Sequence, residues 1–311
     1  MLFHHLFYSE WSLPLYDDIT IHGNGVINQL GIFSKLCVAV FVFVSGYGLV
    51  VSTPIDIKLK DFYWHRFKKL YLNYWFVWIL FVPISVFVFG RTFIEAYGNH
   101  YLVKAILEFF GLSKMIGIMG YNPTWWFYSC IVLLYLLFPL LYKYMFKCTY
   151  LIICLAVTIV LVRFLPGINL ISDYLFAFVT GMLIAKMPIS WIKGVRVWHI
   201  VVALLLLTSW RFSELSPTHI VDGLLCVGMA LLLYKIPMNN WTGRIMENLG
   251  KHSMNMFLIH TFIFYYWFRD YIYFTRNPIL IFLSLLITSY LFSLVIEWLK
   301  RISGFYRLIN R

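Results

Sequence analysis

Two adjacent histidines in apolar surroundings are the residues of this chain best suited to proton transfer. His4 and His5 stand in the apolar stretch MLFHHLFY, residues 1–8. A neutral imidazole can accept or donate a proton near neutral pH, which suits acyl transfer to a hydroxyl group. The alternative is a structural role, either at a helix end in the membrane interface or in a hydrogen bond inside a helical bundle.

Three further residues are candidates for contact with a substrate. His260 lies with Asn255 inside the apolar segment 253–261, where a hydrogen bond between helices is the alternative explanation. Trp125 and Trp126 follow the tripeptide Asn-Pro-Thr at the start of an apolar run. Such an aromatic pair can stack on a sugar ring, or it can belong to the aromatic belt of a membrane protein.

A basic segment and a glycine-rich stretch provide the remaining candidates. Arg66 and Lys69 are three residues apart in WHRFKKLYLNYW and share one helix face, where they can hold phosphates or anchor the chain at the membrane. Ser45 and Tyr47 lie in FVFVSGYGL, whose glycines also permit close helix packing. The five cysteines form no CxxC pair and are expected to be small buried hydrophobic residues, so no metal site is predicted.

The composition indicates that membrane-spanning helices position all of these residues. The chain is 62% hydrophobic and only 12% charged, whereas a soluble protein has about 45–50% apolar and about 25% charged residues. Solid apolar runs favour helices over a barrel of alternating strands. The net charge of +12 comes from short basic clusters between these runs, so nucleic-acid binding is excluded as its explanation.

Nine apolar runs are long enough to predict spans or near-spans of the membrane. The runs cover residues 30–53, 71–89, 125–146, 149–165, 170–187, 197–212, 219–236, 252–268 and 278–299. Residues 1–8 have the character of the end of a tenth helix that begins before Met1, and no signal peptide is recognisable. The predicted fold is therefore all-α, a single polytopic bundle of about ten helices that occupies residues 1–311.

The distribution of basic residues predicts the orientation. With loop 54–70 in the cytoplasm, the cytoplasmic segments hold seventeen lysines and arginines and the opposite side holds seven, while Lys35 lies near the outer start of its run. This bias places the C-terminus in the cytoplasm and segments 9–29 and 90–124 outside. Within the second segment, the spacing of one apolar face predicts a helix on the outer membrane surface or over a cavity. That face consists of Leu102, Ala105, Ile106, Phe109 and Phe110.

An ordered set of motifs over almost the whole chain resembles the bacterial acyltransferase-3 family of integral membrane proteins, which includes O-acetyltransferases of surface polysaccharides. The matching pieces are LFHHLFY, FVFVSGYGL, RFKKLYLNYW, NPTWWFYSCIVLLYLLFPLL, LFAFVTGMLIAK and GKHSMNMFLIHTFIF. The family also has a basic residue earlier in the first helix, a position that here would precede Met1. A proline that often follows the family's basic motif is replaced here by Leu72 or Asn73.

The resemblance implies an enzyme of the bacterial inner membrane. It would take an acetyl group from acetyl-CoA at the cytoplasmic side and transfer it to a hydroxyl of a glycan, either a polysaccharide or a lipid-linked saccharide. His5 would be the catalytic residue beside His4, Arg66 and Lys69 would hold the CoA phosphates, and Ser45 or Tyr47 would donate to the thioester oxygen.

Three alternatives remain open at this stage. A polysaccharide exporter or flippase without acyl chemistry would have a similar composition, although no repeated halves with paired broken helices are visible. A glycan polymerase or ligase would be expected to have a larger outer loop than residues 90–124. A copy truncated in its first helix would be inactive.

Overall fold

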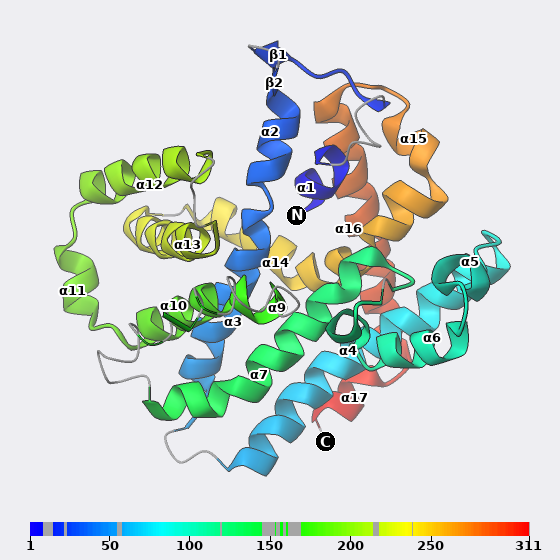
Figure 1. Cartoon of the computed structure of the whole chain (residues 1–311), viewed down its shortest axis with the longest axis horizontal. Coiled ribbons are helices and arrows are strands. Elements are labelled where there is room, and N and C mark those ends of the chain that lie inside the picture. The colour runs from blue at the N-terminus through cyan, green and yellow to red at the C-terminus, as the bar shows by residue number, and fades with distance from the viewer. Residues whose placement is uncertain are drawn as a thin grey trace. The chain divides into compact units, whose positions relative to one another are not determined.

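The computed structural model describes most of the chain and is built almost entirely of helices (Figure 1). It describes residues 1–8, 15–21, 24–54, 58–118, 120–144, 169–213, 218–237 and 239–310, together with residues 153, 156, 157 and 160. Among these residues, five helical stretches are long and apolar enough to cross a membrane, namely Val26–Ser52, Leu59–Phe87, Pro123–Tyr144, Thr218–Lys235 and Pro278–Ile302. The all-α fold predicted from the sequence is confirmed.

The chain forms two compact units that alternate along the sequence. Unit 1 comprises Met1–Lys35, Arg66–Ser129 and Asn239–Arg311, and unit 2 comprises Leu36–His65 and Cys130–Met238. Elements wholly in unit 1 are α1 (Leu2–Phe7), β1 (Thr20–Ile21), β2 (Asn24–Gly25), α2 (Val26–Phe33), α5 (Phe93–Tyr97), α6 (Tyr101–Phe109), η2 (Ser113–Ile116), η3 (Pro123–Trp125), α14 (Asn240–Thr261), η5 (Phe262–Trp267), α15 (Arg269–Tyr273), α16 (Pro278–Ile302) and α17 (Phe305–Asn310). Elements wholly in unit 2 are α3 (Leu36–Ser52), α9 (Asn169–Ser172), α10 (Leu175–Lys186), α11 (Ile189–Gly194), α12 (Val197–Arg211) and α13 (Thr218–Lys235). Helix α4 (Leu59–Phe87) lies mostly in unit 1 and α7 (Trp126–Tyr144) mostly in unit 2.

Most of the predicted apolar runs correspond to helices of the structure. The runs at 170–187 and 197–212 contain the shorter helices α10 and α12, and the run at 252–268 contains the second half of α14 and the π-helical segment η5. The run at 149–165 lies almost entirely outside the described residues. In segment 90–124, the predicted amphipathic helix is α6, and the apolar side chains of Leu102 and Ile106, together with Phe110 at its end, are exposed.

In unit 2, glycines let α3 and α10 approach each other closely. A Cβ atom added at Gly46 would collide with the carbonyl oxygen of Phe178, and one added at Gly181 would collide with that of Phe43. The packing role that the sequence left open for the glycines of FVFVSGYGL therefore holds for Gly46.

Two acidic residues contact basic side chains within unit 2. Asp222 on α13 accepts from Arg211 Nε on α12 at 2.5 Å, and this contact joins the two helices. Asp173 lies 3.2 Å from His219 Nδ1. Both carboxylates therefore stabilise contacts between segments of this unit.

Candidate functional site

The predicted catalytic residue, His5, lies in unit 1 on the short helix α1. Its half-buried ring lies with its centroid 4.9 Å from that of His260 and 5.0 Å from that of His4. Among the described residues, the side chain of His5 has no hydrogen-bond partner, while its backbone N–H donates to the carbonyl oxygen of Met1 at 3.1 Å. The structure thus brings the three predicted histidines together, and the imidazole of His5 is the one whose nitrogens no described residue engages.

His4 contacts α2 and fixes α1 in place. Its Nδ1 lies 2.8 Å from the carbonyl oxygen of Gly31 on α2, and because a carbonyl oxygen can only accept, Nδ1 carries the hydrogen. The ring also stacks on Tyr8 with a centroid distance of 4.8 Å. This buried arrangement favours an anchoring role for His4 over a catalytic one.

Two tyrosines hold the last carbonyl groups of α1, which a helix end leaves without partners of its own. Tyr273 donates to the carbonyl oxygen of Leu6 at 2.9 Å, and Tyr16 donates to that of Phe7 at 3.1 Å. Together with His4, these contacts place His5 at a defined position although its helix has only six residues.

His260 is fully buried on α14 and has a fixed tautomer. Its Nδ1 donates to the carbonyl oxygen of Phe257 at 2.7 Å, so in the neutral ring Nε2 carries only a lone pair. Thr261 Oγ1 lies 3.5 Å from that Nε2 and 3.4 Å from the hydroxyl of Thr124. The imidazole beside His5 is therefore oriented by its own helix and by the segment that precedes α7.

At the junction of α14 with the π-helical segment η5, a backbone carbonyl near His260 accepts from side chains of another segment. The N–H of Phe262 donates to Ile259 O, whereas a regular α-helix would direct it to Leu258 O. Leu258 O instead accepts from Asn122 Nδ2 at 3.2 Å and from Trp125 Nε1 at 3.0 Å.

The two tryptophans of the Asn-Pro-Thr-Trp-Trp motif differ in burial. Trp125 is only 1% exposed, and its ring packs on Tyr74 and Phe262 at centroid distances of 5.2 and 5.6 Å. This burial favours a positioning role for Trp125 over the predicted stacking on a sugar ring. Trp126 is half-buried, and its predicted contact with the acceptor stays a prediction.

A buried carboxyl group, which the sequence did not indicate as functional, anchors the same motif. Glu108 on α6 accepts the backbone N–H of Tyr121 at 2.7 Å and that of Asn122 at 3.4 Å, and it also accepts the hydroxyl of Tyr97. Burial raises the pKa of this carboxyl from 4.5 to about 7, against the opposing effect of these hydrogen bonds and of the Arg91 charge.

The residues predicted to bind acetyl-CoA lie on two helices, α4 and α3. Arg66 is half-buried and Lys69 is exposed on α4, three residues apart in unit 1. Ser45 is half-buried and Tyr47 is exposed on α3, in unit 2. Their predicted contacts with acetyl-CoA stay predictions.

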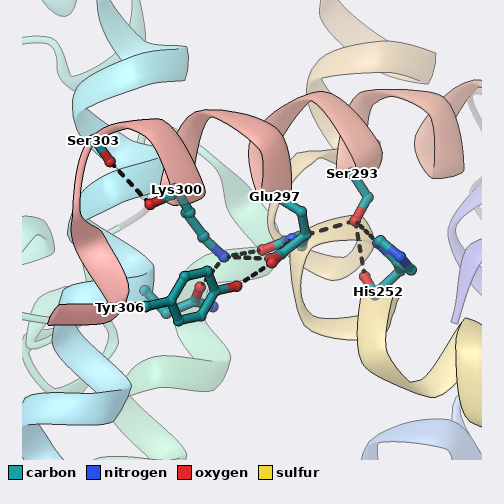
Figure 2. A network of polar contacts seen from close by, with 8 residues as sticks. His252, Ser293, Glu297, Lys300, Ser303 and Tyr306 are labelled. Atoms are coloured by element: carbon teal, nitrogen blue, oxygen red, sulfur yellow. Dashed lines mark hydrogen bonds and ion pairs between the residues drawn. The ribbon is translucent and has the colours of Figure 1, made fainter. Parts of the chain in front are cut away.

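A second polar cluster, which we call the Lys300 cluster, lies where α16 meets α14, α4 and α17 (Figure 2). Lys300 Nζ donates to Asn255 Oδ1 at 2.8 Å and to Glu297 Oε1 at 2.9 Å, and it also donates to Asn73. Glu297 accepts in addition from the hydroxyl of Tyr306. Because the lysine is 3% exposed, these contacts neutralise a buried charge that would otherwise be very costly.

Comparison with known families identifies the class of protein. The chain matches the model of the acyltransferase-3 family, described as an acyltransferase domain, over residues 1–298. Because this match covers nearly the whole chain, the protein belongs to that family, as the ordered motifs predicted. Comparisons with curated proteins and with solved structures give no match. Family membership and the long apolar helices together define a multi-pass membrane acyltransferase.

Proposed function

We propose that this protein transfers an acetyl group from acetyl-CoA to a hydroxyl of a cell-surface or exported glycan, with His5 as the catalytic residue. The observation that carries the proposal is the imidazole of His5, which has no hydrogen bond to described residues and lies beside the buried, oriented His260. Membership of an acyltransferase family supplies the reaction class.

In the proposed reaction, His5 accepts the proton of the acceptor hydroxyl as that oxygen attacks the thioester carbonyl of acetyl-CoA. The new C–O bond forms and the C–S bond breaks. The proton then passes from the imidazolium to the sulfur of the leaving group, so that an O-acetyl ester, free CoA and neutral His5 result. In the alternative route, His5 carries the acetyl group briefly before the hydroxyl receives it.

The surroundings of His5 suit both routes. The hydrogen bond from His260 Nδ1 to the carbonyl oxygen of Phe257 fixes the orientation of this neighbouring ring beside His5. Arg66 and Lys69, on one face of α4, are the proposed partners of the CoA phosphates. In this proposal the protein lies in the bacterial inner membrane with its C-terminus in the cytoplasm, and the acceptor approaches from the outer side.

The proposal is tested by incubating membranes that contain the protein with acetyl-labelled acetyl-CoA, with membranes that lack the protein as the control. We expect label in the carbohydrate fraction that mild alkali releases as acetate, because an ester is cleaved under conditions that leave an amide intact. Unlabelled carbohydrate together with a loss of glycan export in cells without the protein would favour an exporter or flippase and would contradict the proposal.

A further inference from the structure

Glu108 is a buried carboxyl group that the proposed reaction does not use, and its contacts lead directly to the histidine site. It lies in the outer segment on α6 and is 1% exposed, although the neighbouring apolar side chains Leu102 and Ile106 are exposed. The polar side of this helix thus faces the protein. Such an arrangement requires a specific set of partners, because a buried carboxyl without hydrogen bonds is strongly destabilising.

The partners of Glu108 come from the chain on both sides of α6. Tyr97 at the end of α5 and the backbone N–H of Tyr121 both donate to Oε2, while the N–H of Asn122 donates to Oε1 over the longer distance of 3.4 Å. The side chain of Tyr74 on α4 donates to the carbonyl oxygen of Glu108 at 2.8 Å. The carboxyl group therefore fixes the backbone immediately before the Asn-Pro-Thr-Trp-Trp motif.

Asn122 and Trp125 connect the Tyr121–Asn122 turn to α14. Asn122 accepts from the N–H and the hydroxyl of Thr124 and donates to Leu258 O, and Trp125 donates to the same carbonyl. Leu258 precedes His260 by two residues on α14, and the buried ring of His260 contacts that of His5. A movement of the turn at Tyr121–Asn122 would thus be transmitted to His260.

We infer that Glu108 is a positioning residue for acyl transfer, which holds the Tyr121–Asn122 turn so that Asn122 and Trp125 fix the segment of α14 that carries His260. The inference rests on the proposed function. It gives the outer segment a role in catalysis through the site geometry, in addition to any contact with the acceptor.

The charges around Glu108 determine how it can be replaced. Arg91 is the cation that acts on it, and the aromatic hydroxyls of Tyr97, Tyr121, Tyr74 and Tyr266 are the other titratable groups that interact with it. Lys104 is engaged elsewhere, since its Nζ donates to Tyr97 O at 2.6 Å. Glutamine keeps an oxygen that can accept from the Tyr97 hydroxyl and the Tyr121 N–H, so Glu108→Gln should preserve the turn, whereas Glu108→Ala removes all three hydrogen bonds of the side chain.

The test measures the accessibility of His260 and the kinetics of acetyl transfer in membranes of each variant. Diethyl pyrocarbonate is applied at one fixed pH, and its modification of His260 and His5 is quantified by peptide mass spectrometry. We expect His260 to be protected in the wild type and in Glu108→Gln, and modified in Glu108→Ala. With labelled acetyl-CoA, Glu108→Ala should lower kcat by about 10- to 100-fold with little change in KM, and Glu108→Gln should restore it.

Glu95 offers a matched control, because it is an exposed carboxylate of the same segment that only caps α5. Glu95→Ala should leave the protection of His260 unchanged. If Glu108→Ala does not accumulate in membranes, Asn122→Ala removes the next contact in the series and should expose His260 in the same way.

Protection of His260 in both Glu108→Ala and Asn122→Ala would overturn the inference, as would a change in KM alone. The two proposals fail separately in this design. A lack of acetyl transfer in every sample, the wild type included, contradicts the proposed function, while the modification of His260 still decides whether Glu108 holds the site.

Discussion

Replacement of Glu108 by glutamine should remove a pH dependence of stability that this carboxyl imposes on the protein. Burial raises the folded-state pKa to about 7 from an ordinary value of 4.5. Between these two values the folded protein binds a proton that the unfolded chain does not bind. The resulting stabilisation is present at low pH and is lost as the pH rises through about 7.

The size of the effect follows from the pKa difference. Between about pH 5.5 and about pH 8, linkage predicts that the wild type loses about 2 kcal/mol of stability through Glu108 alone. Glutamine does not titrate, so Glu108→Gln should lack this loss. All other titrating groups are shared, and the difference between the two pH dependences isolates the carboxyl.

The assay is thermal unfolding of the purified proteins in one detergent, followed by tryptophan fluorescence at both pH values. We expect the Tm of the wild type to fall more steeply with pH than that of Glu108→Gln, while Glu95→Gln should follow the wild type. Parallel pH dependences of wild type and Glu108→Gln would refute the reasoning, because they would show that the carboxyl does not change its protonation state on folding.

Further predictions concern the other polar and close-packed contacts. Lys300→Met should destabilise the protein by about 1–3 kcal/mol, because it removes the cation of the half-buried Glu297 and the donor to the buried Asn255, and adding Glu297→Gln should recover part of the lost Tm. Gly181→Ala should lower the stability of the protein by about 1–3 kcal/mol, since its methyl group meets the backbone of α3, whereas Gly194→Ala, which has open space around it, should leave Tm unchanged. Trp125→Phe keeps most of the buried ring but loses the donor to Leu258 O, and it should cost about 1 kcal/mol in thermal unfolding.

The sequence was sufficient to predict the helices, because a helix that crosses a membrane needs a long run of apolar residues, and such runs are visible in the sequence. It also predicted the amphipathic helix α6 from the spacing of Leu102, Ile106 and Phe110. It did not reveal that Glu108 on this helix is buried, because periodicity separates two faces without stating which one contacts the protein. The partners that make burial possible are the N–H of Tyr121 in a turn and the hydroxyl of Tyr97 at the end of α5, and tertiary contacts set the positions of both.

In the candidate site, too, the local sequence indicated some features while others depend on tertiary packing. His4 and His5 are adjacent in the sequence and were recognisable as a pair, and the ordered motifs indicated the family. The contact of His5 with His260 depends on the packing of α1 on α14, which no local pattern encodes. The partners of Lys300 were missed for a related reason. Asn73 and Asn255 are on two other helices, and a lysine near the end of an apolar run is ordinarily expected to extend toward the membrane interface.

The most direct test of the account is acetyl transfer by His5→Ala expressed from its own gene, with His199→Ala as the control for loss of a histidine elsewhere. We expect His5→Ala to reach the membrane in normal amounts and to lose acetyl transfer to the glycan by at least about 100-fold. The control should keep the wild-type rate. Acetylation by His5→Ala at the rate of the control would contradict the central claim that this imidazole performs the reaction.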